Sequence, residues 1–346
     1  MTELAMRILT TLGALAIASG SAAVTALAQA PQQPGPFTVG NPLGLPIVPT
    51  AGVSFSPMSS NVKVYGAIFS AESCSYDPVR NLIVVPNRSV GQNVQDNNAW
   101  ISFINHDGSV HTARWIGVNR NELVLNEPLG SDIVNGVLYL ADRDGGLRTI
   151  VTSGTELQAG PNTPQVSVVR KFDMETGRPL GEIRVESSTG FNDIEVAEDG
   201  TIYATVSGAQ GHVYRITPAG EASVFIPTGA PLSSPNGVAL DPAGNIVIVN
   251  SGDDGVLTYD RSGRLILTER AAQPGSDGIV VMSDGTKYVS SVQNGGVSMI
   301  RPRQNAVLIA ENIPSPASMC WDSEANQLVI PMNANNALAF VPLDGR

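Results

Sequence analysis

The sequence predicts an all-β fold: a six-bladed β-propeller with four-stranded antiparallel blades, in which an N-terminal strand closes the last blade. Three observations predict this fold. The 346 residues include 35 Gly and 24 Pro, and only 15% are charged, which suits short strands joined by tight turns. One phrase, a polar residue before an apolar strand and a turn, recurs along the chain. Its spacing of about 40 residues towards the C-terminus is typical of a propeller.

The clearest repeat contains four short apolar segments separated by turn residues. It opens with Ser-Pro-Asn-Gly-Val-Ala-Leu and turns at Asp-Pro-Ala-Gly and again at Asp-Arg-Ser-Gly. Such a meander is one propeller blade. Its strands are expected at residues 234–240, 245–250, 255–259 and 264–268.

Five further copies of the opening phrase align on Asn236, and insertions lengthen the early copies. In a propeller the first strand of each blade lines the central channel, so residues at this position are expected to form a ring around the axis. An open β-sandwich is the alternative fold, but sandwiches do not repeat one phrase at this period. The ring positions are Glu72, Leu129, Asn192, Asn236, Asp277 and Ala317.

Four ring residues carry side-chain oxygen donors, and two of those are carboxylates. Mixed carboxylate and amide oxygens are the ligands that Ca²⁺ accepts, with Zn²⁺, Mn²⁺ or Mg²⁺ as alternatives. Taken singly, each Asn or Asp is also an ordinary turn residue. Two carboxylates facing each other in a channel are costly unless a proton or a cation neutralises them. The register therefore favours a divalent-metal site formed by Glu72, Asn192, Asn236 and Asp277.

Two segments are expected to precede the propeller. Residues 1–28 have the pattern of a secretory signal peptide, with Arg7 before an apolar run and cleavage after Ala28 or, alternatively, after Ala30. Residues 29–61 are rich in Pro, Gly and Ser and are expected to form a linker or an arm laid over the fold.

The propeller is expected to span residues 62–346. Its last repeat is one strand short, and the alternating segment 62–68 is expected to supply the missing outer strand. Joining the two ends in this way removes an exposed sheet edge and closes the ring.

The signal peptide predicts a periplasmic or secreted protein without stable membrane insertion after cleavage; an uncleaved anchor is the alternative. The formal net charge of −11 argues against a nucleic-acid partner, because phosphate binding needs a basic surface. The expected partner is a small molecule at the channel mouth, and the expected state is a monomer.

Two further patterns leave local questions. Cys74 and Cys320 either pair across the ring closure or are two buried apolar residues. The segments 142–146 and 252–255 lack the complete ligand pattern of a calcium loop, and both are expected to be hairpin turns.

The phrases Phe-Asn-Asp at 191–193, Pro-Asn-Gly at 235–237 and Ser-Asp-Gly at 276–278, with Glu72 opening the first blade, resemble the SMP-30/gluconolactonase family and, more distantly, paraoxonase-type lactonases. The resemblance covers the chain from about residue 67 onwards. It implies that Glu72, Asn236 and Asp277 hold a divalent cation, and that Asn192 is a ligand or a substrate contact. It also implies hydrolysis of a lactone.

Two departures from the family pattern concern the substrate. Ser73 and Cys74 replace the Gly-Pro that usually follows the first glutamate, and Gly190 stands where many members place an arginine that holds a sugar. These departures favour a substrate less polar than a sugar lactone, or no substrate at all.

The expected function is metal-dependent hydrolysis of a lactone or similar ester. A cation at the channel mouth polarises the carbonyl, and Asp277 is the expected general base that takes a proton from the attacking water. The alternative is a non-catalytic propeller that binds a small ligand or a protein partner on the same face, because one fold hosts many functions.

Overall fold

The computed structural model describes residues 44–46, 55–57, 59–66, 68–88, 97–117, 123–152 and 156–343. All of them belong to the second of two compact units, residues 33–346. The expected signal peptide lies outside the described residues, as does most of the expected linker. Within that linker segment, β1 (Gly44–Pro46) and β2 (Phe55–Pro57) pair as antiparallel strands. The described part of the chain contains no helix with the length and apolarity needed to cross a membrane.

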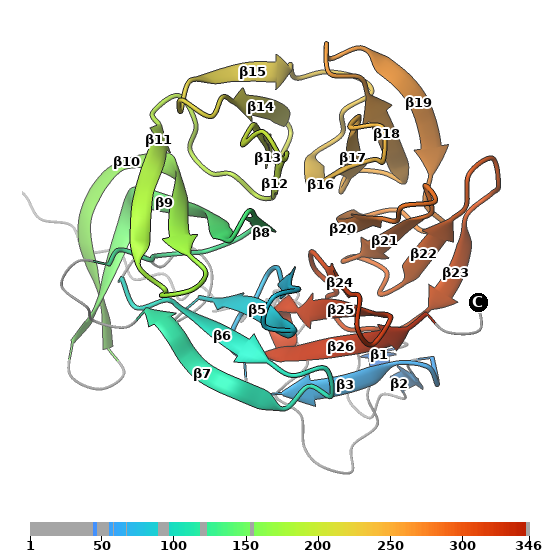
Figure 1. Ribbon diagram of the computed structural model, residues 1–346, viewed down its shortest axis with the longest axis horizontal. Coiled ribbons are helices and arrows are strands. Elements are labelled where there is room, and N and C mark those ends of the chain that lie inside the picture. The colour runs from blue at the N-terminus through green and yellow to red at the C-terminus, as the bar shows by residue number, and fades with distance from the viewer. Residues whose placement is uncertain are drawn as a thin grey trace, which may run out of the picture. The chain divides into compact units, whose positions relative to one another are not determined.

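Six four-stranded antiparallel sheets surround a common axis, which confirms the predicted six-bladed propeller (Figure 1). The first strand of each sheet is the innermost, and the first strands of neighbouring blades contact one another. The first three blades are β4 (Ser75–Asp77), β5 (Leu82–Asn87), β6 (Trp100–Ile104) and β7 (Val110–Gly117); β8 (Ser131–Val134), β9 (Val137–Thr152), β10 (Glu156–Asp173) and β11 (Pro179–Val185); and β12 (Ile194–Val196), β13 (Ile202–Val206), β14 (His212–Ile216) and β15 (Ala222–Ile226).

The remaining blades repeat the same order, and the last one is completed from the N-terminal side. They are β16 (Pro235–Leu240), β17 (Ile246–Asn250), β18 (Gly255–Tyr259) and β19 (Leu265–Arg270); β20 (Ser276–Val281), β21 (Lys287–Ser291), β22 (Val297–Ile300) and β23 (Val307–Ala310); and β24 (Cys320–Asp322), β25 (Gln327–Met332), β26 (Ala337–Pro342) and β3 (Lys63–Gly66). A single 3₁₀ turn, η1 (Asn333–Asn335), joins β25 to β26.

The predicted closure is confirmed. Strand β3 pairs antiparallel with β26, with Gly66 opposite Ala337 and Lys63 opposite Phe340. The blue β3 therefore lies beside the red β26 in Figure 1, and segments from the two ends of the propeller share one sheet. A strand contributed from the other end removes a free edge and ties the first and last parts of the fold together.

The disulfide between Cys74 and Cys320 settles the cysteine question in favour of pairing, with a Cα–Cα distance of 5.5 Å. It joins the inner segment of the first blade to the innermost strand of the last blade. The ring is thus closed twice, by a covalent bond near the axis and by strand pairing at the rim.

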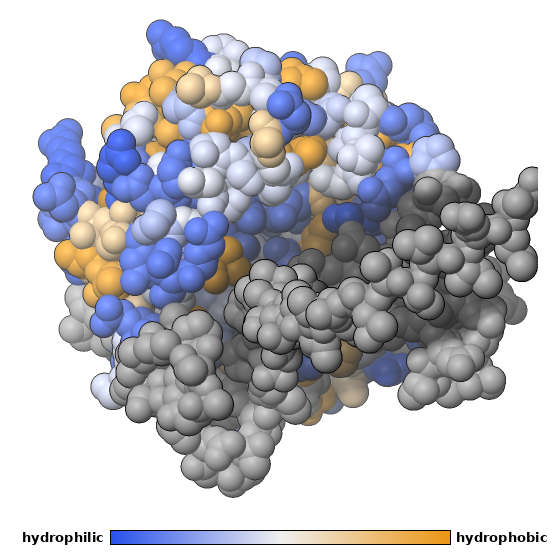
Figure 2. All heavy atoms as spheres, turned by 180° about the vertical axis from the view of Figure 1, so that it is seen from behind, coloured by the Kyte–Doolittle hydropathy of each residue, from blue (hydrophilic) through white to orange (hydrophobic). Residues whose placement is uncertain are grey.

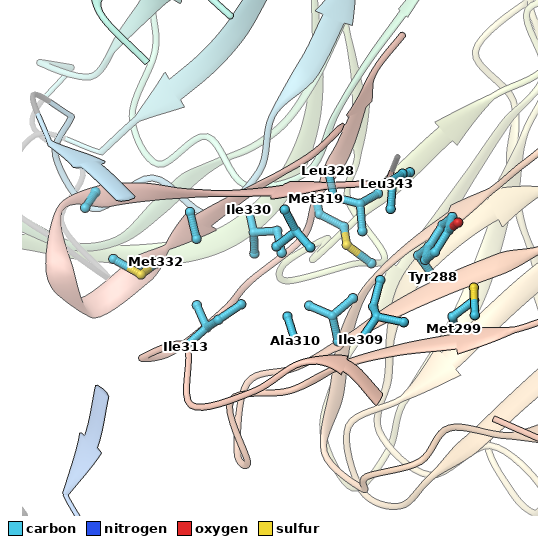
Figure 3. Packing of buried hydrophobic residues seen from close by; sticks show 14 residues of the cluster. Tyr288, Met299, Ile309, Ala310, Ile313, Met319, Leu328, Ile330, Met332 and Leu343 are labelled. Atoms are coloured by element: carbon cyan, nitrogen blue, oxygen red, sulfur yellow. The ribbon is translucent and has the colours of Figure 1, made fainter. Parts of the chain in front are cut away.

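Buried hydrophobic side chains form six clusters within the described residues, one between each pair of neighbouring blades. In the cluster between the fifth and sixth blades, Tyr288 and Met299 pack against Leu328 and Ile330 (Figure 3). Each fully buried Leu or Ile contributes about 1.5–3 kcal/mol. The face seen in Figure 2 mixes hydrophilic and hydrophobic residues where it is coloured.

The Asn-Gly and Asp-Gly pairs of the repeated phrase lie inside inner strands rather than in turns. Both Asn236 and Asp277 occupy a bulge in which their strand carries one more residue than its partner: Pro235 pairs with Asn250 and Val238 with Ile248 in the first case. A bulge changes the direction in which side chains point, compared with a regular β-ladder. A Cβ added at Gly237 would lie 2.4 Å from the Asp277 backbone oxygen, so glycine lets neighbouring inner strands approach closely.

The expected hairpin turn at residues 142–146 is wrong, because this segment lies within the long strand β9. Its acidic residues are neutralised by a residue far away in sequence. Arg170 of β10 contacts Asp142 and Asp144, with Nε 2.5 Å from Asp142 Oδ2, and this pairing keeps the segment extended. The other expected turn, at 252–255, is a bend, and Asp253 Oδ1 accepts a hydrogen bond from the Gly255 backbone nitrogen.

Candidate active site

The four predicted ligands come from four different blades and lie at the same end of the inner strands. Glu72 precedes β4, Asn192 precedes β12, and Asn236 and Asp277 lie in β16 and β20. Glu72, Asn236 and Asp277 are buried, and Asn192 is half-buried. Asn236 Nδ2 donates a hydrogen bond to Asp277 Oδ2 over 3.3 Å, which links two of the ligands directly.

Each of the four residues has one buried oxygen without a hydrogen-bond partner among the described residues. These atoms are Glu72 Oε2, Asn192 Oδ1, Asn236 Oδ1 and Asp277 Oδ1. Buried polar atoms are almost always hydrogen-bonded, and leaving one unsatisfied costs about 1–3 kcal/mol. Four unsatisfied oxygens in one ring, two of them from carboxylates, fit the donor set of a hard divalent cation.

A cavity of ≈ 280 Å³ lies at this ring. Its polar lining includes three of the predicted ligands and three charged residues that the sequence analysis did not single out: Glu72, Asn192, Asp277, Arg88, Glu127 and Arg143. Glu127 lies two positions before Leu129 and Arg88 directly follows β5, but no turn or repeat pattern marks either residue. Asn236 reaches the site through its contact with Asp277.

The two carboxylates of the ring hold protons unusually tightly. Burial and the nearby Asp193 raise the pKa of Asp277 to about 7. Burial, then the charge of Asp277, raises the pKa of Glu72 well above its ordinary value, while Arg88 partly opposes the shift. A divalent cation would reverse this balance, because it favours the ionised form of each carboxylate.

Glu127 lies between two guanidinium groups. Its Oε1 is 3.9 Å from Arg88 Nη1 and its Oε2 is 3.4 Å from Arg143 Nε. Two further hydrogen bonds hold Arg88 in place. Its Nε donates to the Ser70 backbone oxygen, and its Nη2 donates to Asn333 Oδ1. The cavity therefore carries both charge signs, with acids around the axis and arginines on one wall.

Gly190 stands where many family members have an arginine. It lies against the guanidinium of Arg143. A Cβ added at Gly190 would lie 3.2 Å from Arg143 Nη2 and 3.3 Å from its Cζ. The space beside Gly190 is thus taken up by an arginine of strand β9.

A second acidic group lies further along the inner strands and lines a separate hollow of ≈ 200 Å³. It consists of Asp132, Asp193 and Glu195, and each is hydrogen-bonded to a backbone nitrogen of the following blade or of its own strand. Burial raises the pKa of Asp193 to about 7 and that of Asp132 to about 6. Both oxygens of Asp132 and of Asp193 and one oxygen of Glu195 accept these hydrogen bonds, which distinguishes this group from the ring above it.

Within the described residues, no group of three or more His, Cys, Asp or Glu side chains is placed to hold a metal ion. The predicted set contains only two carboxylates and takes its remaining oxygens from two asparagines. The candidate site therefore depends on amide ligands, which Ca²⁺ accepts more readily than Zn²⁺ does.

The fold and this ring place the protein in a structural class, the propellers with carboxylate and amide oxygens at the channel mouth. The sequence profile described as "SMP-30/Gluconolactonase/LRE-like region" matches residues 134–332, more than half of the chain. The chain belongs to this SMP-30/gluconolactonase/LRE-like family, and in fold and family it is a lactonase-like propeller. No curated protein matches the sequence.

Solved structures share the fold at low sequence identity. A gluconolactonase from Xanthomonas campestris is 17% identical, with a TM-score of 0.55 over 82% of this chain and 90% of that chain. Virginiamycin B lyase from Staphylococcus aureus is 12% identical, also with a TM-score of 0.55, over 83% of this chain and 99% of that chain. At these identities the similarity concerns the fold.

Proposed function

We propose that this chain is an exported, metal-dependent hydrolase that opens a lactone or similar ester at the channel mouth. A divalent cation is bound there by four residues, and Ca²⁺ is the preferred ion. The four residues are Glu72, Asn192, Asn236 and Asp277. The observation that carries the proposal is the set of four buried oxygens without partners, one from each of these residues. Membership in a family that includes gluconolactonases supports the reaction class.

The reaction is addition of water to the lactone carbonyl carbon, followed by cleavage of the ring C–O bond. When bound, the cation supplies charge that polarises the carbonyl and stabilises the developing oxyanion. Asp277 accepts the proton of the attacking water, and the ring oxygen takes up a proton as it leaves, so the product is a hydroxy acid. Asp277 is chosen as the base because it lines the cavity and its Oδ1 has no hydrogen-bond partner among the described residues.

Export is supported by the Cys74–Cys320 disulfide, because disulfides persist in oxidising compartments such as the periplasm and the extracellular space. The proposed location is therefore periplasmic or secreted. The proposed partner is the small-molecule substrate alone.

The metal site is tested by thermal unfolding in EDTA and in Ca²⁺. Wild-type protein is expected to gain about 4 kcal/mol of stability when free Ca²⁺ is about 1,000 times the dissociation constant. Glu72→Gln and Asp277→Ala are expected to lose most of this gain, while the exposed Glu221→Gln keeps it. If Glu72→Gln and Asp277→Ala respond to Ca²⁺ and EDTA as the wild type does, the metal site is wrong.

The proposed hydrolase activity is tested separately from the metal site. A panel of lactones and esters is expected to include at least one that wild-type protein opens in Ca²⁺ but not in EDTA. Asp277→Ala is expected to lower kcat by about 100-fold or more, the size of effect that a general base contributes. Cation binding without any metal-dependent turnover would instead favour the non-catalytic propeller.

A further inference from the structure

Arg143 carries a guanidinium that the structure aims at the candidate site without giving it a full set of partners. Its Nε lies 3.4 Å from Glu127 Oε2 but does not hydrogen-bond to it, and its two terminal nitrogens make no hydrogen bond to any described residue. Its side chain is only 16% exposed, and it lines the cavity together with Asn192 and Asp277. The terminal nitrogens therefore offer free donors at the cavity wall, where a ligand with acceptor oxygens could engage them.

The backbone of Arg143 is held firmly. Asn126 Nδ2 donates to the Arg143 backbone oxygen over 3.1 Å, and the acidic neighbours Asp142 and Asp144 are both engaged by Arg170. Those two acids are thus withdrawn from Arg143. The side chain instead lies over Gly190, where an added Cβ would make a tight contact with it, 3.2 Å from Nη2.

The charges around the cavity favour an anionic ligand group once the cation is present. Three carboxylates line the cavity, those of Glu72, Glu127 and Asp277, together with the guanidinium groups of Arg88 and Arg143. With a divalent cation the formal sum is −3 + 2 + 2 = +1. Arginine is also the residue that best matches a planar carboxylate, through two parallel hydrogen bonds.

We propose that Arg143 determines substrate specificity by binding a carboxylate carried by the substrate, so that the preferred substrate is a lactone or ester with a second, anionic group. This inference rests on the proposed function, since it concerns the same cavity. It replaces the expectation of a less polar substrate, which followed from Gly190 alone. The guanidinium is present, but strand β9 supplies it.

The test compares two lactones that differ only in a carboxylate: γ-butyrolactone and its γ-carboxylated form, 5-oxotetrahydrofuran-2-carboxylate. The wild type is expected to have a kcat/KM about 10- to 100-fold higher for the carboxylated lactone, the range of a charge-assisted hydrogen bond. Arg143→Ala is expected to abolish this preference by raising KM for the carboxylated lactone alone. Arg143→Lys is expected to restore it in part, and the exposed Arg264→Gln to leave it unchanged.

A compensating variant makes the test specific to this geometry. The Arg143→Ala, Gly190→Arg double variant removes the side chain that fills the space over Gly190 and returns a guanidinium from the neighbouring segment. We expect it to recover part of the preference that Arg143→Ala loses. Gly190→Arg alone is expected to weaken binding, because two guanidinium groups would then compete for one place.

Binding of the products separates this inference from the proposed function. With Ca²⁺ in excess, calorimetry is expected to show that the wild type binds 2-hydroxyglutarate about tenfold or more tightly than 4-hydroxybutyrate, and that Arg143→Ala does not. Equal kcat/KM for the two lactones, or a preference that Arg143→Ala keeps, would overturn the assignment of Arg143. Either result would still support the proposed hydrolase activity. If neither lactone is opened but 2-hydroxyglutarate binding depends on Arg143, the anion site stands and the hydrolase does not.

Discussion

At the residue scale, two buried carboxylates along the axis have raised pKa values in the cation-free protein. Burial raises the pKa of Asp277 and of Asp193 from 3.8 to about 7. Between these two values the folded, cation-free protein holds protons that the unfolded chain has already released. Its stability therefore falls as the pH rises through this range.

This linkage predicts the pH dependence of unfolding. In EDTA, the melting temperature is expected to fall from about pH 5 to about pH 8, and Ca²⁺ is expected to raise it more at the higher pH, because protons and the cation compete for the same oxygens. Asp277→Asn, which cannot ionise, is expected to show a shallower fall in EDTA. A melting temperature in EDTA that rises over this pH range would contradict the prediction.

The ring residues show how far single positions can be predicted. Glu72, Asn192, Asn236 and Asp277 were found from register alone, because a repeat aligns equivalent positions of every blade. Arg143 was missed, because its approach to the site depends on the conformation of β9 and on the absence of a side chain at Gly190. No spacing in the chain relates these two positions.

At the element scale, the propeller is closed by pairing of β3 with β26 and by the disulfide. The disulfide spans 246 positions in sequence, so it restricts a large part of the unfolded chain. The strand pairing followed from the missing outer strand of the last repeat. The disulfide did not follow, because sequence does not give the distance between two Cα atoms.

Removal of this disulfide is expected to weaken the whole ring. The Cys74→Ser, Cys320→Ser double variant is expected to lose about 2–5 kcal/mol of unfolding free energy, measured by urea denaturation. It is also expected to bind Ca²⁺ more weakly, since Cys74 lies two positions after Glu72. The wild type in a reducing agent provides the matched comparison, and equal midpoints for variant and oxidised wild type would show that strand pairing alone closes the ring.

Strand β9 is the element that the sequence misrepresents. Asp-Arg-Asp-Gly-Gly predicts a turn locally, since its Asp and Gly residues favour one. In the structure the segment pairs with β10, where Arg170, 28 positions away from Asp142, neutralises the two acids. Long-range charge pairing of this kind overrides local propensity.

At the scale of the whole molecule, the candidate metal site joins four of the six blades. A cation held there is expected to stabilise the ring as a unit rather than one sheet. Hydrogen exchange is expected to slow on addition of Ca²⁺ in the first, third, fourth and fifth blades together, for amides that exchange by global opening. Protection confined to residues next to Asp277 would show that the cation is bound by one blade only.

The sequence by itself determined the number of blades, their strand order, the closing strand and the ring of oxygen donors, because all of these repeat with a regular period or complete that repeat. Only the tertiary structure decided the pairing of Cys74 with Cys320, the extended form of β9 and the place of Arg143 over Gly190. These features depend on distances between residues of different blades or strands. A repeat aligns equivalent positions, but it does not say which unlike positions meet across the axis.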